Sequence, residues 1–600
     1  AIFALHPLMV ESTAWVTERK NVLSMFFFLA AILSYGRFAG YWKDSHAAPR
    51  RGSFALAWFL FVGALLSKIT AFALPAVILL LCWWKRGRIR WKEDVLPILP
   101  FFAVSVGLGL WITWLEKHHV GAQGADWNLN WMERILVAGR VPWFYAGKLL
   151  WPFHLCFVYP KWPLDTGAMW QWLFPVAAVA ALVIPWLLRN RIGRGMAAAA
   201  FYFFGTLFPV LGFLNFYWTL FSYVGDHLVY LSSLGVLVPV AAMVATMANR
   251  WRKPALQYGF AILFLPLLAA LTWREAGQYR NAATMWRSTI SKNPACWLAY
   301  NNLASDFLQT KGHADEAQVL CEKSVSMKPD FPEAHYNLGV VHHQMGRTEE
   351  EIAEYETALK FSPAFANAHL NLGEALARKG RSDDAMSHYQ KVMALKPSEP
   401  EAHYNMGNLL IEKGEVDQAI AAYQQALIIK PDYVLAHNNL GNSLLRKKEV
   451  GEAIAHFETA AQIDPGYVMA HQNLGSIYLK LGRYREAIDH CEKAVKIDPS
   501  DLGTLSNLAW LLATAPEPSL RDGPRALELA RHASELSGGN HPTVLHTLAA
   551  AYAEDNRFDE AAQTAERALS LATAQGNNTL AEVIRNERTL YLAGQPVRAK

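Results

Sequence analysis

The sequence predicts an all-α protein in which a polytopic transmembrane helical domain is followed by a solenoid of repeated helix pairs. Three observations indicate this fold class: apolar stretches fill the first half, a 34-residue period runs through the second, and the charge changes sign between them. Residues 1–293 carry 27 Lys and Arg against 11 Asp and Glu, whereas residues 294–600 carry 29 against 40. A basic, apolar half and an acidic, periodic half are typical of a membrane domain and a soluble domain.

Composition also bounds the possible partners. Nucleic acid fits neither half, because the basic residues stand between apolar stretches and the repeat half is acidic. The five cysteines are scattered, with neither metal-ligand spacing nor a disulfide framework, so no metal site is predicted. The chain begins inside an apolar stretch without a cleavable signal peptide, and we expect its natural N-terminus to lie upstream.

The first element is a polar segment, His6 to Asn21, that precedes an apolar stretch long enough to cross a bilayer. We therefore expect this segment at a membrane surface. Four of its residues share one helical face by their spacing: Glu11, Trp15, Glu18 and Arg19. From spacing alone two interpretations stay open, an interfacial helix with snorkelling Arg19 and Lys20 or a functional site.

Eight candidate membrane spans follow from length and hydropathy. They are 22–42, 54–66, 69–84, 95–115, 170–188, 197–216, 228–248 and 256–273. Residues 135–151 are also apolar, but Arg140 and Lys148 predict that this segment does not cross. The clusters of Lys and Arg then fall on one face, which the positive-inside rule makes cytoplasmic. The polar segment and the repeats are expected on the opposite, outer face.

The second half carries the period of tetratricopeptide repeats. Prolines recur at 294, 329, 363, 397, 431, 465 and 499. Small residues mark the close approach of two helices, Gly339, Gly373, Gly407, Gly441 and Gly475 in the first helix and Ala385, Ala419, Ala453 and Ala487 in the second. Glu351 replaces Ala in its repeat, which predicts looser packing there. The predicted domains are 1–275 (membrane), 276–293 (linker), 294–575 (about eight repeats) and 576–600 (capping helix and tail).

Two ladders of polar residues follow the repeat period. The first comprises Asn302, Asn337, Asn371, Asn405, Asn439, Asn473 and Asn507, and the second comprises His335, His369, His403, His437 and His471. Successive repeats lie on the order of 10 Å apart, so the ladder histidines of different repeats cannot share a metal ion. A side-chain amide offers a donor and an acceptor to a peptide backbone. The Asn ladder therefore indicates either peptide binding or a residue that is simply common at this repeat position.

One run of residues carries a family resemblance. The pattern His-Pro-x3-Glu-x3-Trp-Val-x2-Arg-Lys-x2-Leu, from His6 to Leu23, resembles the outer-face loop of the transmembrane and tetratricopeptide-repeat (TMTC-like) membrane proteins. These are relatives of the GT-C-type protein O-mannosyltransferases. Residues 66–68, 144–148 and 223–235 agree with the same family, and the Asn ladder resembles that of the soluble O-linked N-acetylglucosamine transferase.

The resemblance implies which residues would form the site. Arg19 and Lys20, with Lys148 as a weaker third, would contact the phosphate of a polyprenyl-phosphate sugar. The donor-site candidates are Asp226, His227 and Tyr230, although Asp226 also fits a helix N-cap, Tyr230 fits an interfacial aromatic, and family members often carry Arg in place of His227. The catalytic base is expected upstream of residue 1, which leaves Glu11 and Glu18 as supporting acidic groups.

Two functions stay open at this stage. The resemblance implies a membrane enzyme that moves a sugar from a lipid phosphate to Ser or Thr of proteins on the outer face, while the repeats bind the acceptor protein. The alternative is a non-catalytic scaffold whose membrane half anchors repeats that recruit envelope proteins. The expected partners are the bilayer, a lipid-linked sugar and client proteins, and the expected location is a bacterial inner membrane with the repeats in the periplasm. The sequence leaves open the sugar and any requirement for a divalent metal.

Overall fold

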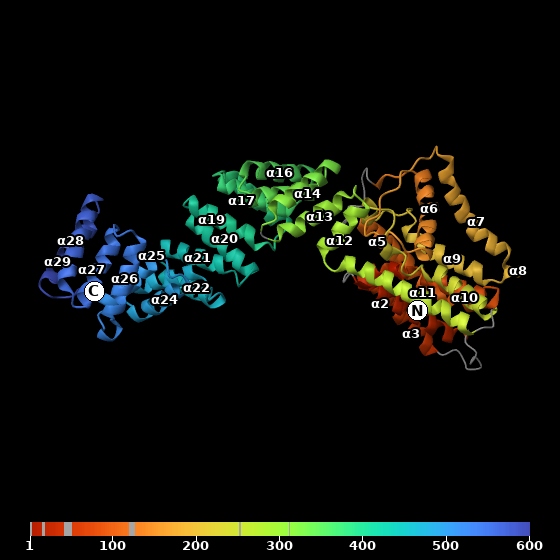
Figure 1. Ribbon diagram of the computed structural model, residues 1–600, viewed down its shortest axis with the longest axis horizontal. Coiled ribbons are helices and arrows are strands. Elements are labelled where there is room, and N and C mark those ends of the chain that lie inside the picture. Colours follow the sequence, from red (N-terminus) through yellow and green to blue (C-terminus); the bar gives the residue numbers. More distant parts are fainter. Residues whose placement is uncertain are drawn as a thin grey trace. The chain divides into compact units, whose positions relative to one another are not determined.

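The computed structural model describes residues 3–14, 18–40, 51–118, 127–250, 254–310 and 312–599. Over these ranges the chain forms α-helices and short 3₁₀ turns, with one π turn and no strand (Figure 1). This confirms the all-α prediction. The chain divides into two compact units, Ala1–Arg347 and Thr348–Lys600.

Each predicted membrane span coincides with a helix of the first unit. These helices are α2 (Arg19–Phe38), α3 (Arg51–Ser67), α4 (Leu74–Arg86), α5 (Leu99–His118), α7 (Leu173–Leu187), α9 (Gly195–Leu207), α10 (Leu234–Arg250) and α11 (Pro254–Ala276). By length and composition, three stretches of the described residues can cross a membrane, namely Arg19–Phe38, Trp91–His118 and Met169–Leu187. Arg51–Ser67, Gly195–Val210 and Leu234–Met247 are apolar but shorter than a standard span.

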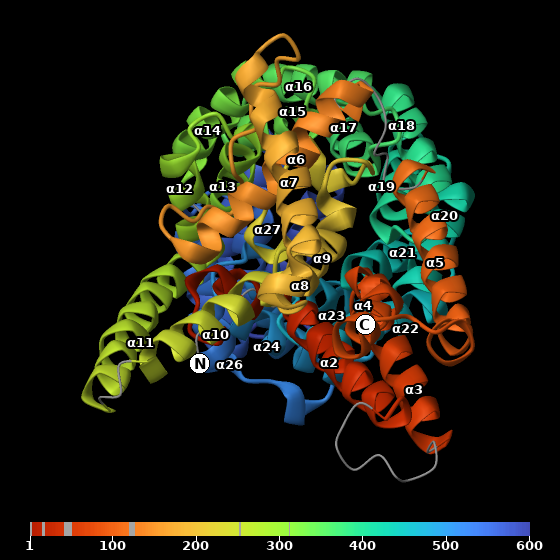
Figure 2. The same cartoon turned by 90° about the vertical axis from the view of Figure 1, so that its right-hand side faces the viewer.

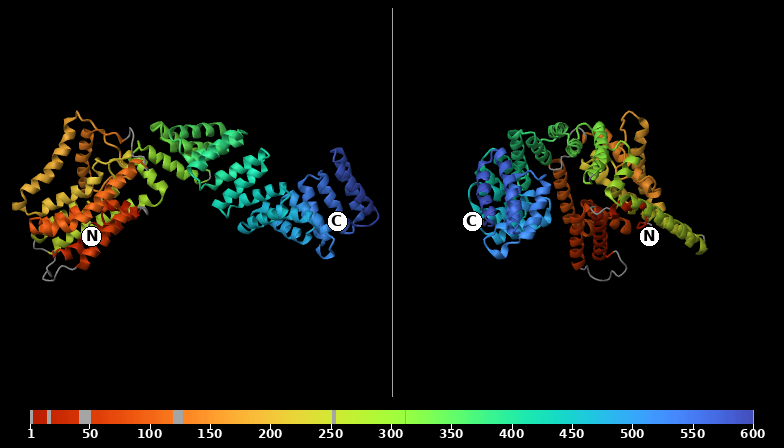
Figure 3. Two further views of the ribbon diagram at one scale, coloured as in Figure 1. Left: turned by 180° about the vertical axis from the view of Figure 1, so that it is seen from behind. Right: turned by 60° about the vertical axis from the view of Figure 1, so that its left-hand side comes forward.

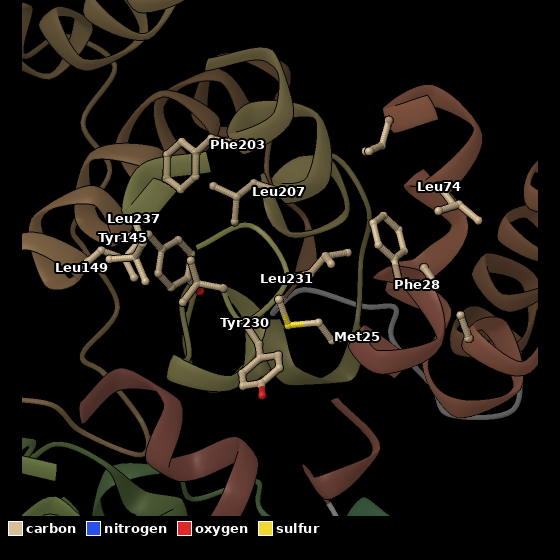
Figure 4. Packing of buried hydrophobic residues seen from close by; sticks show 14 of the residues in the cluster. Met25, Phe28, Leu74, Tyr145, Leu149, Phe203, Leu207, Tyr230, Leu231 and Leu237 are labelled. Atoms are coloured by element: carbon tan, nitrogen blue, oxygen red, sulfur yellow. The ribbon is translucent and has the colours of Figure 1, made fainter. Parts of the chain in front are cut away.

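The core of the first unit joins helices that are far apart in sequence. Helix α2 packs along α3, α4 packs on α9, and α9 also contacts α7 and α10 (Figure 2). Figure 4 shows Phe28 of α2, Leu74 of α4 and Phe203 of α9 among the buried side chains. Helix α6 (Trp131–Leu150) packs against α7 so closely that a methyl group at Gly139 would lie 2.4 Å from the Pro175 nitrogen. A side chain at that position would force the two helices apart.

The polar segment forms two short elements and the start of a third. The turn η1 (Pro7–Met9) and helix α1 (Val10–Ala14) lie against α11, and the Thr272 hydroxyl of α11 donates to the Leu5 carbonyl oxygen at 2.6 Å. Glu11 lies on α1, whereas Glu18 is the N-cap residue of α2. The predicted single helical face is therefore wrong for these two carboxylates, which lie on separate helices. Trp15 is outside the described residues.

Helix pairs with the predicted period follow in chain order (Figure 3). Their bounds are α13 (Trp297–Leu308) and α14 (Ala314–Met327), α15 (Pro332–Gln344) and α16 (Thr348–Phe361), α17 (Ala366–Arg378) and α18 (Ser382–Leu395), α19 (Pro400–Glu412) and α20 (Val416–Ile429), α21 (Val434–Arg446) and α22 (Val450–Ile463), α23 (Val468–Lys480) and α24 (Tyr484–Ile497), α25 (Leu502–Thr514) and α26 (Gly523–Leu536), and α27 (Pro542–Glu554) and α28 (Phe558–Ala574). The predicted capping helix is α29 (Asn578–Leu592). The residues predicted as a linker form η11 (Gly277–Tyr279) and α12 (Ala282–Lys292).

Four of the repeat glycines, Gly373, Gly407, Gly441 and Gly475, lie where two helices meet, as predicted. A methyl group would lie 2.6 Å from a tyrosine carbon of the following helix at Gly373 and at Gly407. The prediction of loose packing at Glu351 needs correction. This residue is buried, and its carboxylate accepts a hydrogen bond from Arg378 Nη2 at 2.6 Å. An ion pair therefore takes the place of the small side chain.

Candidate functional site

His6 anchors the polar segment on helix α6. Its Nδ1 accepts the Leu8 backbone N–H at 3.2 Å, so its Nε2 carries the ring proton and donates to the Leu149 carbonyl oxygen at 2.8 Å. Burial lowers the pKa of His6, although the hydrogen bond to Leu149 opposes this effect. The ring therefore stays neutral and holds the start of α1 in one position.

Glu11 holds His227. The Glu11 carboxylate is 1% exposed, and its Oε1 lies 2.5 Å from His227 Nδ1. Its Oε2 accepts the His227 backbone N–H at 3.1 Å. The ring of Trp218 meets the His227 ring edge to face, with centroids 5.0 Å apart. Two hydrogen bonds and one ring contact therefore fix the imidazole and direct its Nε2 away from Glu11.

Asp226 lies beside this pair in a different role from the one predicted. Gly225, not Asp226, is the N-cap of the turn η10 (Asp226–Leu228), and the Asp226 carboxylate accepts the Tyr159 hydroxyl at 2.8 Å. Burial raises the pKa of Asp226 well above its usual value, and the nearby charge of Glu11 adds to this effect. Tyr230 is likewise buried, at 7% exposed, and packs on Phe3 rather than facing an interface.

Glu18 forms ion pairs with two cations of the site, Lys20 and Lys68. Its Oε2 accepts from Lys68 Nζ at 3.2 Å and from Asn21 Nδ2 at 2.9 Å, and its Oε1 lies 3.3 Å from Lys20 Nζ. Arg19 and Lys20 are exposed at the first turn of α2, where the helix dipole favours an anion. The side chain of Lys68, only 13% exposed, lies behind them. Three cations and a helix N-terminus therefore meet at one end of α2.

The charges of this cluster affect one another. Burial raises the pKa of Glu18, but His227, Lys68 and Lys20 together outweigh burial, so the net pKa is lowered. Burial lowers the pKa of Lys68, and the attraction of Glu18 offsets part of that shift. Sequence analysis assigned no role to Lys68. The one sequence feature that could have drawn attention to Lys68 is its place as a single lysine between two apolar stretches, in the 66–68 motif.

A small polar cavity connects the two groups of residues. Its lining includes Asn21 and Thr70 beside the cations, and His227 and Tyr230 beside Glu11. Thr206 of α9 also lines this cavity, and it lines the end of an apolar groove of about 920 Å³ as well. The groove is formed by side chains of α4, α5, α7 and α9, such as Trp83, Phe102, Trp186 and Phe204, and by Phe72 in the 3₁₀ turn η3 (Ile69–Ala73) before α4. The apolar groove and this cavity of about 10 Å³ thus share Thr206, and the nearest cations, Lys20 and Lys68, connect to the cavity through Glu18 and Asn21.

Lys148 lies in different surroundings from Arg19 and Lys20. Its Nζ donates to the carbonyl oxygens of Phe153 at 2.6 Å and His154 at 3.1 Å, and it stands 5.5 Å from the Tyr159 ring centroid. It lines a separate hollow of about 590 Å³ with Trp143 and Trp151. Its predicted contact with a phosphate stays a prediction.

The Asn ladder links adjacent repeats. Five of its members donate from Nδ2 to a side chain of the preceding repeat: Asn337 to Asn301 (2.9 Å), Asn371 to Tyr355 (3.3 Å), Asn405 to Glu374 (2.8 Å), Asn439 to Asn408 (2.9 Å) and Asn473 to Asn438 (2.9 Å). Asn439 has further partners, since its Nδ2 also donates to the Tyr404 hydroxyl at 3.2 Å and its Oδ1 accepts from Asn438 Nδ2 at 3.2 Å. Peptide binding by the ladder stays a prediction.

No group of three or more His, Cys, Asp or Glu residues that could hold a metal ion occurs in the part of the chain that the structure describes. In the cluster at the start of α2, the three cations Arg19, Lys20 and Lys68 outnumber the one carboxylate that contacts two of them, Glu18. The cluster offers guanidinium and ammonium donors to a phosphate, and the groove beyond Thr206 offers an apolar surface.

Comparison with protein-family models identifies the repeats. Models described as tetratricopeptide repeat match residues 267–320, 320–353, 344–380, 368–401, 407–448, 434–467, 468–501 and 544–579. The second half of the chain is a tetratricopeptide-repeat region.

Two curated relatives confirm the family resemblance. Protein O-mannosyl-transferase Tmtc3 from Drosophila melanogaster is 23% identical over 407 residues, which covers 59% of this chain and 43% of the relative. Protein O-mannosyl-transferase Tmtc2 from the same species is 28% identical over 116 residues, covering 19% of this chain and 12% of the relative. The chain spans less than half the length of these relatives.

Two of the solved structures that match cover about a third of this chain or less. MamA is 28% identical and covers 27% of this chain and 95% of its own, with a TM-score of 0.26. YrrB, described as a TPR protein with an unusual peptide-binding site, is 21% identical and covers 31% of this chain and 96% of its own, with a TM-score of 0.28.

Proposed function

We propose that this membrane protein, a tetratricopeptide-repeat relative of protein O-mannosyl-transferases, transfers a sugar from a polyprenyl-phosphate donor to Ser or Thr hydroxyls of proteins. One observation carries the proposal. An apolar groove of about 920 Å³ shares Thr206 with a small cavity, and Asn21 in the lining of that cavity bonds Glu18, the partner of Lys20 and Lys68. A lipid phosphate has the same two parts, an apolar chain and an anionic head, and each part matches one part of this site.

The roles of the cations follow from their exposure. Arg19 and Lys20 are exposed and would contact the phosphate directly, with Arg19 able to donate two parallel hydrogen bonds. Lys68 is nearly buried and would supply charge from behind, held in place by Glu18. During transfer the acceptor hydroxyl oxygen bonds to the anomeric carbon of the sugar and its proton passes to water, while the bond from that carbon to the phosphate oxygen breaks. The phosphate takes the electron pair, and the cations stabilise its added negative charge.

Glu11 and Glu18 act as positioning residues in this mechanism. Each carboxylate already contacts a basic side chain, Glu11 that of His227 and Glu18 that of Lys68. The cations around Glu18 lower its pKa, which makes this carboxylate a weaker base toward a substrate hydroxyl. Glu11 would set the direction of His227 Nε2 toward the donor head group.

The orientation in the membrane rests on which helix ends lie together. Lys68, at the end of α3, bonds Glu18 at the start of α2. At the opposite ends, Arg86 of α4 donates to the Ala39 carbonyl oxygen at 2.6 Å, and Arg194 donates to the Trp83 carbonyl oxygen at 3.4 Å. The positive clusters beyond α2, α4 and α8 (Arg189–Ile192) therefore support a cytoplasmic side, and the cation site then lies on the outer side with the repeats.

The repeats would hold the acceptor protein. The ladder residues other than Asn337 are partly exposed, and a side-chain amide offers a donor and an acceptor to the backbone of an extended peptide. This gives binding that tolerates many peptide sequences. In this proposal the membrane unit performs the transfer and the repeats bring the hydroxyl to it.

The test is sugar transfer by the complete natural protein in proteoliposomes that contain a polyprenyl-phosphate sugar. We expect Arg19→Ala to reduce transfer by about 100-fold or more, since an electrostatic donor to a developing charge typically contributes that much. Lys85→Ala is the matched control, because this exposed lysine lies at the far end of α4. Full activity of Arg19→Ala would refute the phosphate site, and absence of transfer in the wild type would favour the membrane-anchored scaffold.

A further inference from the structure

Three histidine pairs recur inside the repeats. In each pair a ladder histidine of the first helix faces a histidine 19 residues later, on the second helix of the same repeat. The Nδ1 to Nδ1 distances are 2.8 Å for His369 and His388, 3.0 Å for His437 and His456, and 3.0 Å for His471 and His490. Ladder histidines of different repeats lie too far apart to bind one metal ion together. Within a repeat, the histidine of the second helix lies close enough to the ladder histidine for both to bind the same ion.

The hydrogen bonds fix the proton positions in each pair. Nε2 of His369 lies 3.1 Å from the Pro363 carbonyl oxygen, and Nε2 of His437 lies 2.9 Å from the Pro431 carbonyl oxygen. A carbonyl oxygen can only accept, so each of these Nε2 atoms carries the proton and each Nδ1 presents its lone pair to the partner ring. The second-helix ring must then donate from its own Nδ1. One proton lies between two imidazole nitrogens.

We propose that each pair is a binding site for a late first-row transition-metal ion, of the zinc or copper class, which takes the place of that proton. Imidazole is a preferred ligand of these ions. Two nitrogens at about 2.0 to 2.1 Å from a tetrahedral zinc lie about 3.3 Å apart, so the rings need to separate by only a few tenths of an ångström. The carbonyl of Pro363 or Pro431 is a second-shell partner that already fixes the tautomer of the first ligand.

Binding at this site conserves protons. The second-helix ring moves its proton from Nδ1 to Nε2, so both Nδ1 lone pairs face the metal and no proton leaves the pair. Water completes the coordination shell, because the two imidazoles occupy two positions and the rings of His388, His456 and His490 are partly exposed. The sites are open and would exchange metal readily with the surroundings.

Neighbouring charges rank the sites. The pair of His369 and His388 faces Lys391 and Arg381 as well as Asp384. The pair of His471 and His490 faces the carboxylates of Asp489 and Glu458 and a single cation, Lys493. A divalent cation is repelled by the first surroundings more than by the second. The site at His471 and His490 should therefore bind the metal ion more tightly than the site at His369 and His388.

One repeat provides a matched control. His403 occupies the ladder position in α19, and the residue 19 positions later is Ala422. This repeat has the same first-helix histidine without a second imidazole at the facing position. His403→Gln therefore removes a ladder histidine and no pair.

The experiment is calorimetric titration of the full chain in detergent with Zn²⁺ alone, at pH 7.5. We expect His388→Gln, His456→Gln and His490→Gln each to remove one equivalent of bound zinc, the triple variant to remove three, and His403→Gln to remove none. Circular dichroism of each variant checks that the helices persist, since Gln retains a hydrogen-bonding group. Unchanged zinc stoichiometry in the triple variant would refute the proposal, and so would an equal loss in His403→Gln.

Discussion

The repeats that follow Pro294 and the membrane unit, meaning the part of the chain before them, hold their buried polar groups in different ways. In the repeats, partners are close in sequence: Asn439 bonds Asn408, 31 residues earlier, and each histidine pair spans 19 residues. In the membrane unit, Glu11 bonds His227 across 216 residues and Glu18 bonds Lys68 across 50. Stability in the repeats is therefore a sum of local contacts. The candidate site exists only when the whole membrane unit is folded.

The stability of a single repeat is best tested at the ion pair between Glu351 and Arg378, where Glu351 stands at a position usually held by a small residue. Arg378→Met should destabilise its repeat by about 3 kcal/mol, because it removes the guanidinium that pairs with the buried Glu351 carboxylate at 2.6 Å. Glu351→Ala, which restores the small side chain typical of this position, should be neutral or stabilising. Hydrogen exchange of the α16 and α17 amides in the full chain measures both. Equal destabilisation by the two variants would contradict this account.

The corresponding test in the membrane unit should have long-range effects. Lys68→Met leaves Glu18 without its nearly buried partner, and we expect a loss of about 2 kcal/mol in stability of this unit. The exposure of Glu18, 14%, makes the effect smaller than at Glu351. Faster hydrogen exchange should appear in both α2 and α3. Exchange that changes only beside Lys68 would show that the site is as local as a repeat contact.

Glycine substitutions test close packing directly. Gly373→Ala places a methyl group 2.6 Å from Tyr389 and should destabilise its repeat by about 1 to 2 kcal/mol. Gly451→Ala meets no atom within 4 Å and should stabilise α22 by about 0.5 to 1 kcal/mol, because Ala loses less backbone entropy. Thermal unfolding monitored by amide exchange compares them. The same sign in both variants would rule out the close approach.

Alkaline pH offers the smallest but most specific test. Burial lowers the pKa of Lys68, so its charge is lost at a lower pH than that of an ordinary lysine. Binding of a lipid phosphate should therefore weaken as pH rises toward 10, and Lys68→Arg, which keeps its charge, should bind more strongly than wild type at that pH. Binding curves from pH 7 to 10 measure this. Parallel curves for the two proteins would exclude a role of the Lys68 charge.

The contrast between the units also explains what the sequence could predict. The 34-residue period determined the repeat helices, their glycine contacts and the capping helix, because each repeat packs on its neighbour in the same way. The second-helix histidines escaped notice because position 422 is Ala and breaks their period. In the membrane unit, Arg19 and Lys20 were identified from a motif, but Lys68 and Tyr159 were not given roles, because their partners lie far away in sequence.

Local signals also failed where tertiary contacts competed with them. Asp226 reads as a helix N-cap, yet its carboxylate accepts the Tyr159 hydroxyl, because Gly225 begins the turn instead. Tyr230 reads as an interfacial aromatic, yet it is buried against Phe3. Glu11 and Glu18 have the spacing of one helical face, but α1 ends at Ala14 and α2 begins at Arg19. In each case a contact from a distant segment decides the conformation.

The most direct test of the central claim is the binding of a radiolabelled polyprenyl phosphate to the purified full chain in detergent. Wild type should retain the lipid, and the double variant Arg19→Ala/Lys20→Ala should bind it at least about tenfold more weakly, since each charged contact typically contributes more than 1 kcal/mol. The Lys85→Ala control should bind as wild type does. Equal binding by wild type and the double variant would show that the cations at the start of α2 do not hold a lipid phosphate.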